Sequence, residues 1–259
     1  MNGVPQRIVC LSAEAADWLW RLGAWERVVG VTAFFVPPPG VPGKPRVGGF
    51  SSANLDQIIQ LKPDLVITFS DVQTKLAAEL RRRGLNVLAT DQRTLAETEA
   101  TLEQLARAVG CEREAELRLQ EFRERLAPIA KPASRPRVYF EEWNDPLISG
   151  IAWISELIER AGGEDIFPEL RAKRSAPERV VSPEQVRHAN PDIILASWCG
   201  KPVKTATIAS RPGWQDLTAV RQRRMWAIAS ADILQPGWRL IQGYGRLRSI
   251  LGSATRGES

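Results

Sequence analysis

One segment of the sequence occurs twice, half a chain apart. Residues 54–68, NLDQIIQLKPDLVIT, are answered 128 positions later by residues 182–196, SPEQVRHANPDIILA. Each copy has a polar first residue, an acid, a Gln and a Pro-Asp pair followed by apolar residues, which predicts a capped short helix, a turn and a buried strand. Two such copies predict two similar lobes, and a cleft between lobes is a favoured place for a ligand.

Strand and helix patterns alternate on both sides of the repeat. Strands are expected at residues 7–11, 28–32, 65–69, 85–89, 137–140, 193–197 and 224–229. Helices are expected at residues 13–22, 75–83, 153–161 and 240–251. This alternation predicts an α/β fold with parallel sheets covered by helices. We therefore expect an N-terminal lobe of residues 1–93 and a C-terminal lobe of residues 132–259.

A helical segment is expected between the lobes, at residues 94–131. Its second half places Leu119, Phe122, Leu126 and Ile129 at alternating spacings of three and four, which is a helical stripe. We expect one helix from Cys111 to Ala130, of which about 18 residues would span roughly 27 Å. That length is enough to cross from one lobe to the other.

Composition excludes several classes of protein. The chain has 259 residues, of which 44% are hydrophobic and 25% charged, as in a soluble globular protein. No run of 18 apolar residues is present, so no transmembrane segment is expected. The net charge of +5 comes largely from Arg-rich helices, and no zinc-finger, RNP or basic-zipper pattern accompanies it, so no nucleic-acid partner is predicted. The three cysteines lack the spacing of a metal site or a disulfide framework.

Five segments of the chain resemble the helical-backbone class of ABC-importer substrate-binding proteins, and most of all the vitamin B12-binding proteins. They are RIVCLS at 7–12, NLDQIIQLKPDLV at 54–66, SG at 149–150, AGGEDIF at 161–167 and SPEQVRHANPD at 182–192. The resemblance implies two Rossmann-like lobes with parallel sheets, joined by a single long backbone helix, with the ligand in the cleft between them. It also implies an extracytoplasmic location. The N-terminus shows no signal-peptide pattern, so we expect the protein in the cytoplasm if the sequence is complete.

The resemblance further implies that one acid on each lobe docks onto arginines of an ABC permease dimer. By position in the repeat, these acids are Asp56 and Glu184. A second explanation for both is local, because an acid in the first turn of a helix is stabilised by the helix dipole. We expect the protein itself to be a monomer.

Family ligands lie at the carboxyl ends of strands, as is general for open α/β sheets. The aromatic residues expected to contact the ligand are Phe34, Phe35, Phe50, Phe69, Trp143, Trp198 and Trp238. Glu142 and Gln235 are expected to supply hydrogen bonds. B12-binding relatives also carry aromatic residues at the positions of Phe34, Phe50 and Phe69. Facing aromatic side chains suit a large flat ligand such as a corrin or porphyrin.

The scarcity of metal-binding side chains narrows the choice of ligand. His188 is the only histidine and lies in a repeat helix, and the two tyrosines, Tyr139 and Tyr244, lie in a strand and the last helix. A bare transition metal needs several such ligands, and a haem receptor usually offers an axial His or Tyr. We therefore predict capture of cobalamin or a related corrinoid, whose cobalt arrives with the ligand, with no covalent cofactor and no metal site in the protein.

Three other functions stay open. A ferric siderophore or haem could be the ligand, because Lys201, Lys204 and Arg239 could meet an anion and the Cys199 thiol could approach a metal centre. A cytoplasmic corrinoid carrier or sensor is the second. An enzyme on the same fold is the third, but the chain has no P-loop or dinucleotide motif, and its single histidine gives no Ser-His-Asp set. We therefore predict a non-enzymatic binding protein.

Overall fold

The computed structural model describes residues 3–49, 52–130, 132 and 134–256. The chain divides into two compact units. The first comprises Met1–Gln92, Ala96–Phe122 and Pro236–Trp238, and the second comprises Arg93–Leu95, Arg123–Gln235 and Arg239–Ser259. Compared with the expected lobes, most of the helical segment clusters with the first unit, and so does a short stretch of the C-terminal half. The expected ligand cleft between the lobes stays a prediction.

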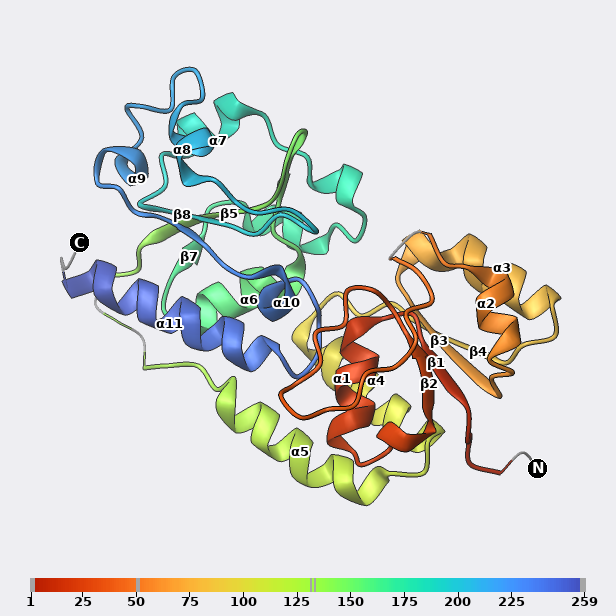
Figure 1. Cartoon of the computed structure of the whole chain (residues 1–259). Coiled ribbons are helices and arrows are strands. Elements are labelled where there is room, and N and C mark those ends of the chain that lie inside the picture. The colour runs from red at the N-terminus through yellow and green to blue at the C-terminus, as the bar shows by residue number, and fades with distance from the viewer. Residues whose placement is uncertain (1–2, 50–51, 131, 133, 257–259) are drawn as a thin grey trace. The chain divides into compact units, whose positions relative to one another are not determined.

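The first unit is built on a four-stranded parallel sheet. Its strand order is β2 (Val28–Val31), β1 (Ile8–Cys10), β3 (Leu65–Phe69) and β4 (Val87–Thr90). Figure 1 shows helices on both faces, with α1 (Ala13–Arg21) and α4 (Leu95–Ala108) on one and α2 (Leu55–Gln60) and α3 (Thr74–Arg82) on the other. Alternate strand residues serve the two faces: Val9 and Val66 pack in one core cluster with Ile58 of α2 and Leu80 of α3.

The second unit has a sheet that is parallel except for one strand. Its order is β6 (Leu147–Ser149), β5 (Arg137–Asn144), β8 (Ile193–Ala196) and β9 (Met225–Ala227), with the short β7 (Glu164–Asp165) also pairing with β5. Only β6 is antiparallel, because it returns from β5 in a hairpin. The predicted α/β architecture with parallel sheets in two units is thus confirmed, with this hairpin added.

Helices cover both faces of the second sheet as well (Figure 1). On one face lie α7 (Pro183–Ala189), α8 (Thr205–Ala209) and α9 (Thr218–Arg221), and on the other lie α6 (Ala152–Arg160), α10 (Ser230–Ile233) and α11 (Leu240–Arg256). Tyr139 and Ile194 of the central strands share a core cluster with Val186 of α7 and Ile208 of α8. No helix in the described part of the chain is long and apolar enough to cross a membrane.

The sequence repeat forms the same structure in each unit. Asn54 and Ser182 accept a hydrogen bond from the backbone N–H three residues on and so cap the repeat helices. The Asp of each Pro-Asp pair reaches the start of the neighbouring strand, because Asp64 accepts from the backbone N–H of Arg7 at 2.9 Å and Asp192 from that of Arg137 at 2.8 Å.

Arg7 and Arg137 in turn donate hydrogen bonds to backbone oxygens at the C-terminal ends of the repeat helices. The Arg7 guanidinium donates to the backbone oxygens of Leu61 and Lys62, and the Arg137 guanidinium donates to that of Ala189. Ala189 is the last residue of α7, and Leu61 and Lys62 directly follow α2, so these carbonyls have no partner within a helix. Pro-Asp therefore joins each repeat helix to its sheet, and the repeat extends to an arginine more than 50 residues upstream.

The helix that follows α4 ends earlier than predicted. We expected it to extend to Ala130, whereas α5 covers Glu112–Arg125, 14 residues or about 21 Å. Pro128 stops it, because proline disfavours a helical residue before it and clashes with the carbonyl four residues back. The division between the two units falls inside this helix, after Phe122.

Candidate functional site

Two tryptophans and a lysine meet at the carboxyl ends of neighbouring strands in the second unit. β5 and β8 run in parallel with Glu141 opposite Ala196, so Trp143 and Trp198, each two residues further on, lie side by side. Lys201 follows in the loop after β8, with its Nζ atom 3.9 Å from the ring centroid of Trp143 and 5.4 Å from that of Trp198. We call these three residues the Trp–Lys cluster. Lys201 is exposed and Trp143 is half-buried, whereas Trp198 is only 5% exposed, so Trp143 offers most of the accessible aromatic area.

A buried ion pair holds Trp198 in place. The Glu141 carboxylate is fully buried and accepts two hydrogen bonds from Arg211, at 2.5 and 2.8 Å. Its Oε1 atom also accepts from the indole N–H of Trp198 at 3.0 Å. Arg211 lies over the ring of Trp214, which is fully buried. Glu141 therefore links the aromatic ring at the site to the core of the unit.

A second buried arginine forms an ion pair with Glu142. Arg179 is only 1% exposed, and it donates to both carboxylate oxygens of Glu142, at 2.6 and 3.2 Å, and to the backbone oxygen of Ser149 at 2.5 Å. The strand was expected to end at residue 140, but β5 extends through Asn144 because it pairs with β6. Glu142 is thus part of the sheet, and its charge is balanced within the protein.

The thiol nearest the Trp–Lys cluster is poorly suited to bind a metal. Partial burial raises the pKa of Cys199, and the nearby Glu142 carboxylate raises this pKa further. The neutral thiol is therefore favoured, whereas a metal binds the thiolate. Within the described residues, no group of three His, Cys, Asp or Glu side chains could hold a metal ion.

The aromatic residues predicted in the first unit have different surroundings. Phe34, after β2, is 39% exposed. Phe35 is 3% exposed and packs against Trp25, with ring centroids 5.3 Å apart. Phe69 is buried at the end of β3. Phe50 lies outside the described residues.

Trp238 is buried in an aromatic stack of the first unit. Its ring centroid lies 6.0 Å from that of Trp18 and 6.2 Å from that of Phe122, and the Arg21 guanidinium lies 4.9 Å from its centroid. These contacts explain why residues 236–238 cluster with the first unit. Gln235, just before this stretch, is half-buried.

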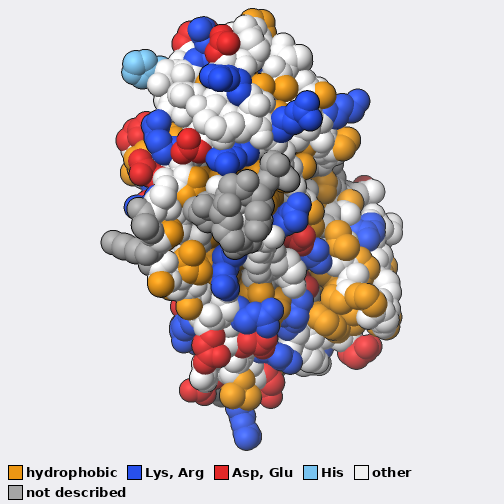
Figure 2. All heavy atoms as spheres, turned by 90° about the vertical axis from the view of Figure 1, so that its left-hand side faces the viewer, with side chains coloured by type: hydrophobic (Ala, Val, Ile, Leu, Met, Phe, Trp, Pro, Cys, Tyr) orange, Lys and Arg blue, Asp and Glu red, His pale blue; other side chains and the backbone are white. Residues whose placement is uncertain are grey.

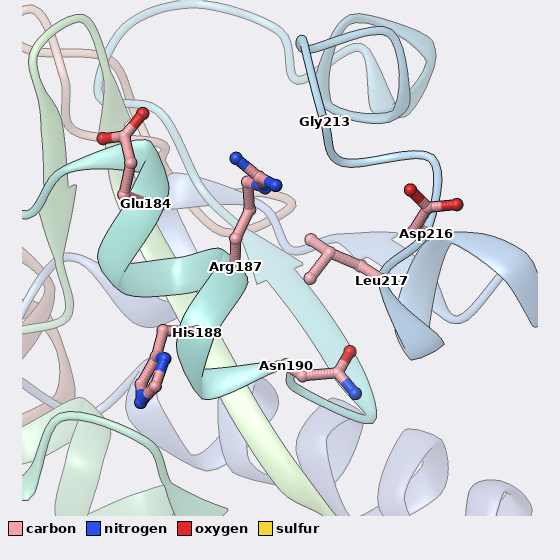
Figure 3. A pocket seen from close by; sticks show the side chains of 7 residues that line it. All are labelled: Glu184, Arg187, His188, Asn190, Gly213, Asp216 and Leu217. Atoms are coloured by element: carbon pink, nitrogen blue, oxygen red, sulfur yellow. The ribbon is translucent and has the colours of Figure 1, made fainter.

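The two predicted docking acids occupy equivalent places in their own units. Asp56 and Glu184 are exposed and lie in the first turns of α2 and α7. Glu184 also borders a hollow of about 460 Å³, which Figure 3 shows. The other residues that line it are Arg187, His188, Asn190, Gly213, Asp216 and Leu217. Arg187 extends toward Gly213, where any larger residue would place its Cβ 2.8 Å from the arginine Nε.

Both tyrosines are in the core. Tyr139 is buried beside Phe167 and Trp214, and the Tyr244 hydroxyl lies 2.8 and 2.9 Å from the backbone oxygens of Ala127 and Arg160. Figure 2 shows Lys and Arg side chains spread over one face of the molecule, with groups of Asp and Glu side chains among them. Such mixing is typical of a solvated surface.

Comparison with known proteins identifies the family. The chain matches the model of the family described as "Periplasmic binding protein" over residues 8–231. The chain therefore belongs to the periplasmic binding proteins, the non-enzymatic substrate-binding components of ABC-type import.

Individual relatives are similar along most of their length. The chain is 27% identical to the cobalamin-binding protein of Halobacterium salinarum, over 98% of this chain and 72% of that protein. It is 25% identical to the vitamin B12-binding protein of Vibrio cholerae, over 97% and 91%. The fold is similar to that of the periplasmic heme-binding protein RhuT from Roseiflexus sp. RS-1 in apo form, with a TM-score of 0.81, 23% identity and coverage of 96% and 98%.

Proposed function

We propose that this protein captures cobalamin or a related corrinoid and delivers it to an ABC importer. The observation that carries the proposal is the Trp–Lys cluster at the carboxyl ends of β5 and β8. A corrin presents a broad apolar face, and indole rings offer large apolar area with few rotatable bonds. The names of the H. salinarum and V. cholerae relatives support the same ligand class.

Haem is the second candidate, supported by the fold shared with a heme-binding protein. Haem iron is usually held by a protein side chain such as His, Tyr or Cys. Here both tyrosines are buried, His188 lies on α7 beside the docking acid, and the Cys199 pKa is raised, which favours the thiol. A corrinoid needs none of these groups, because its cobalt is held by the macrocycle. We therefore place the corrinoid first.

Trp143→Ala is expected to weaken cyanocobalamin binding by about 30-fold, since a central aromatic contact contributes about 2 kcal/mol. Equilibrium dialysis read by the ligand's own absorbance measures this without relying on protein fluorescence. Trp226→Ala is the matched control, because Trp226 is also half-buried in this sheet but lies on β9 away from the cluster. Equal affinity of the Trp143 variant and the wild type would remove the Trp–Lys cluster from the site. Binding of hemin or a ferric siderophore with no corrinoid binding would replace the corrinoid assignment.

Asp56→Gln and Glu184→Gln test delivery to the importer. We expect each to weaken association with a purified ABC importer of the same ligand by about 30-fold, because removing one partner of an interfacial charge pair costs about 2 kcal/mol or more. Ligand affinity should not change. Glu116→Gln, at an exposed position of α5, is the control. Association unaffected by the double variant would leave the two acids with only their helix-dipole role.

A further inference from the structure

The ammonium of Lys201 occupies the place at which a flat ligand would stack. Its Nζ atom lies 3.9 Å from the centroid of the Trp143 ring, so it covers one ring face. The Trp143 indole is itself held in orientation, because its Nε1 donates to the backbone oxygen of Asp145 at 2.8 Å. A ligand that stacks on this face must move the cation aside and lose this cation–π contact.

The two carboxylates of β5 beside the cluster, Glu141 and Glu142, already have arginine partners. Glu141 is paired with Arg211, and Glu142 is paired with Arg179. Both arginines are buried more deeply than Lys201, which is exposed. In the described part of the chain, Lys201 itself forms no ion pair. The charges of these two acids and two arginines cancel, so neither acid compensates the positive charge of Lys201.

We propose that Lys201 makes the site select flat macrocycles that carry an anionic group at the rim, a phosphodiester or a carboxylate. This inference rests on the proposed function and names the ligand class of that site. A neutral macrocycle displaces the ammonium from the indole and offers it no new charged partner. A macrocycle with a rim anion lets the ammonium swing from the ring face to the anion, which gives a charge-assisted hydrogen bond. Among corrinoids, complete cobalamin has such a phosphodiester and cobinamide lacks it.

Two matched pairs of probes test the selection and separate the two anions. Cyanocobalamin is compared with dicyanocobinamide, and hemin with hemin dimethyl ester, each by equilibrium dialysis against wild type and Lys201→Met. The variant keeps an unbranched apolar stem and removes the charge. In whichever pair binds, we expect Lys201→Met to weaken binding of the anion-bearing member about tenfold. A loss of this size is typical of a hydrogen bond to a charged group. Affinity for the neutral member should not fall.

The test compares the ratio of affinities within a pair between wild type and Lys201→Met. The members of a pair also differ in size, but this difference is the same for both proteins. Lys204→Met is the control, since Lys204 is exposed three positions on and should leave the ratio unchanged. Raising the salt from 50 to 500 mM should reduce the ratio for wild type only, because screening acts on the ammonium–anion pair. If corrinoids bind but Lys201→Met leaves the ratio as in wild type, the inference is wrong and the proposed function stands. If only the hemin pair binds, the corrinoid assignment is wrong. The ratio of hemin to hemin dimethyl ester affinity then tests the role of Lys201 in the same way. Binding of none of the four would overturn both.

Discussion

Glu141→Ala is expected to lower the melting temperature by about 10 °C, the largest effect of any single substitution considered for this protein. The change leaves the Arg211 guanidinium, whose side chain is 14% exposed, without its bidentate partner. It also removes the acceptor for the indole N–H of Trp198. An uncompensated buried charge costs about 3–5 kcal/mol, which exceeds what the pair itself contributes when intact.

Thermal unfolding followed by circular dichroism measures this loss. Arg118→Ala is the control, because Arg118 and Glu121 form an exposed pair at 3.5 Å on α5, and such pairs contribute less than about 1 kcal/mol. A melting temperature for Glu141→Ala within two degrees of the Arg118→Ala value would contradict the prediction. Because Glu141 orients Trp198, we also expect weaker ligand binding in this variant below its melting temperature.

Glu14→Gln is expected to stabilise the protein at pH 8 and to change little at pH 5. Glu14 lies in the first turn of α1 with 6% of its surface exposed, and its Oε1 atom has no hydrogen-bond partner. Gly237 packs directly over it, since a Cβ there would lie 2.7 Å from the Glu14 Cβ. Burial raises the pKa of Glu14 from 4.5 to about 7, although its own backbone N–H and the Ser12 side chain oppose the rise.

The sign of the effect follows from proton binding. Between pH 4.5 and about 7 the folded protein keeps the Glu14 proton that the unfolded chain has released, so stability falls as the pH rises through this window. The shift corresponds to about 3 kcal/mol once the pH exceeds the folded-state pKa. Glutamine does not titrate, so it avoids this loss.

Urea unfolding of both proteins at pH 5 and pH 8 provides the measurement. The stability difference between variant and wild type should be about 2 kcal/mol larger at pH 8. Glu116→Gln, at an exposed position, should show the same difference at both pH values. A pH-independent effect of Glu14→Gln would mean that Glu14 ionises in the folded protein as it does in the unfolded chain.

Features with a local cause were predictable from the sequence. The repeat predicted two units of one design, and α2, β3, α7 and β8 lie where it placed them. Capping residues, Pro-Asp turns and alternation act over a few residues, so their pattern is visible in the chain. The carboxyl ends of strands follow from the same pattern, which is why Trp143 and Trp198 were found together.

Features set by distant contacts were missed. Nothing in the sequence pairs Glu141 with Arg211, 70 residues away, or Glu142 with Arg179, 37 residues away. The same holds for Arg7 and Arg137, which complete the repeat from outside it. Glu142 was predicted to supply hydrogen bonds to the ligand, and its pairing with the buried Arg179 was not foreseen.

The sequence by itself determined the fold family, the two-unit plan and the aromatic residues that follow β5 and β8. Only the tertiary structure decided which of the candidate aromatics are exposed: Phe34 is exposed, whereas Phe35, Trp198 and Trp238 are buried. It also decided that Glu141 and Glu142 pair with arginines and therefore do not neutralise Lys201. The reason is physical: periodicity and capping depend on neighbours in the chain, whereas burial and charge pairing depend on whatever the folded chain brings alongside.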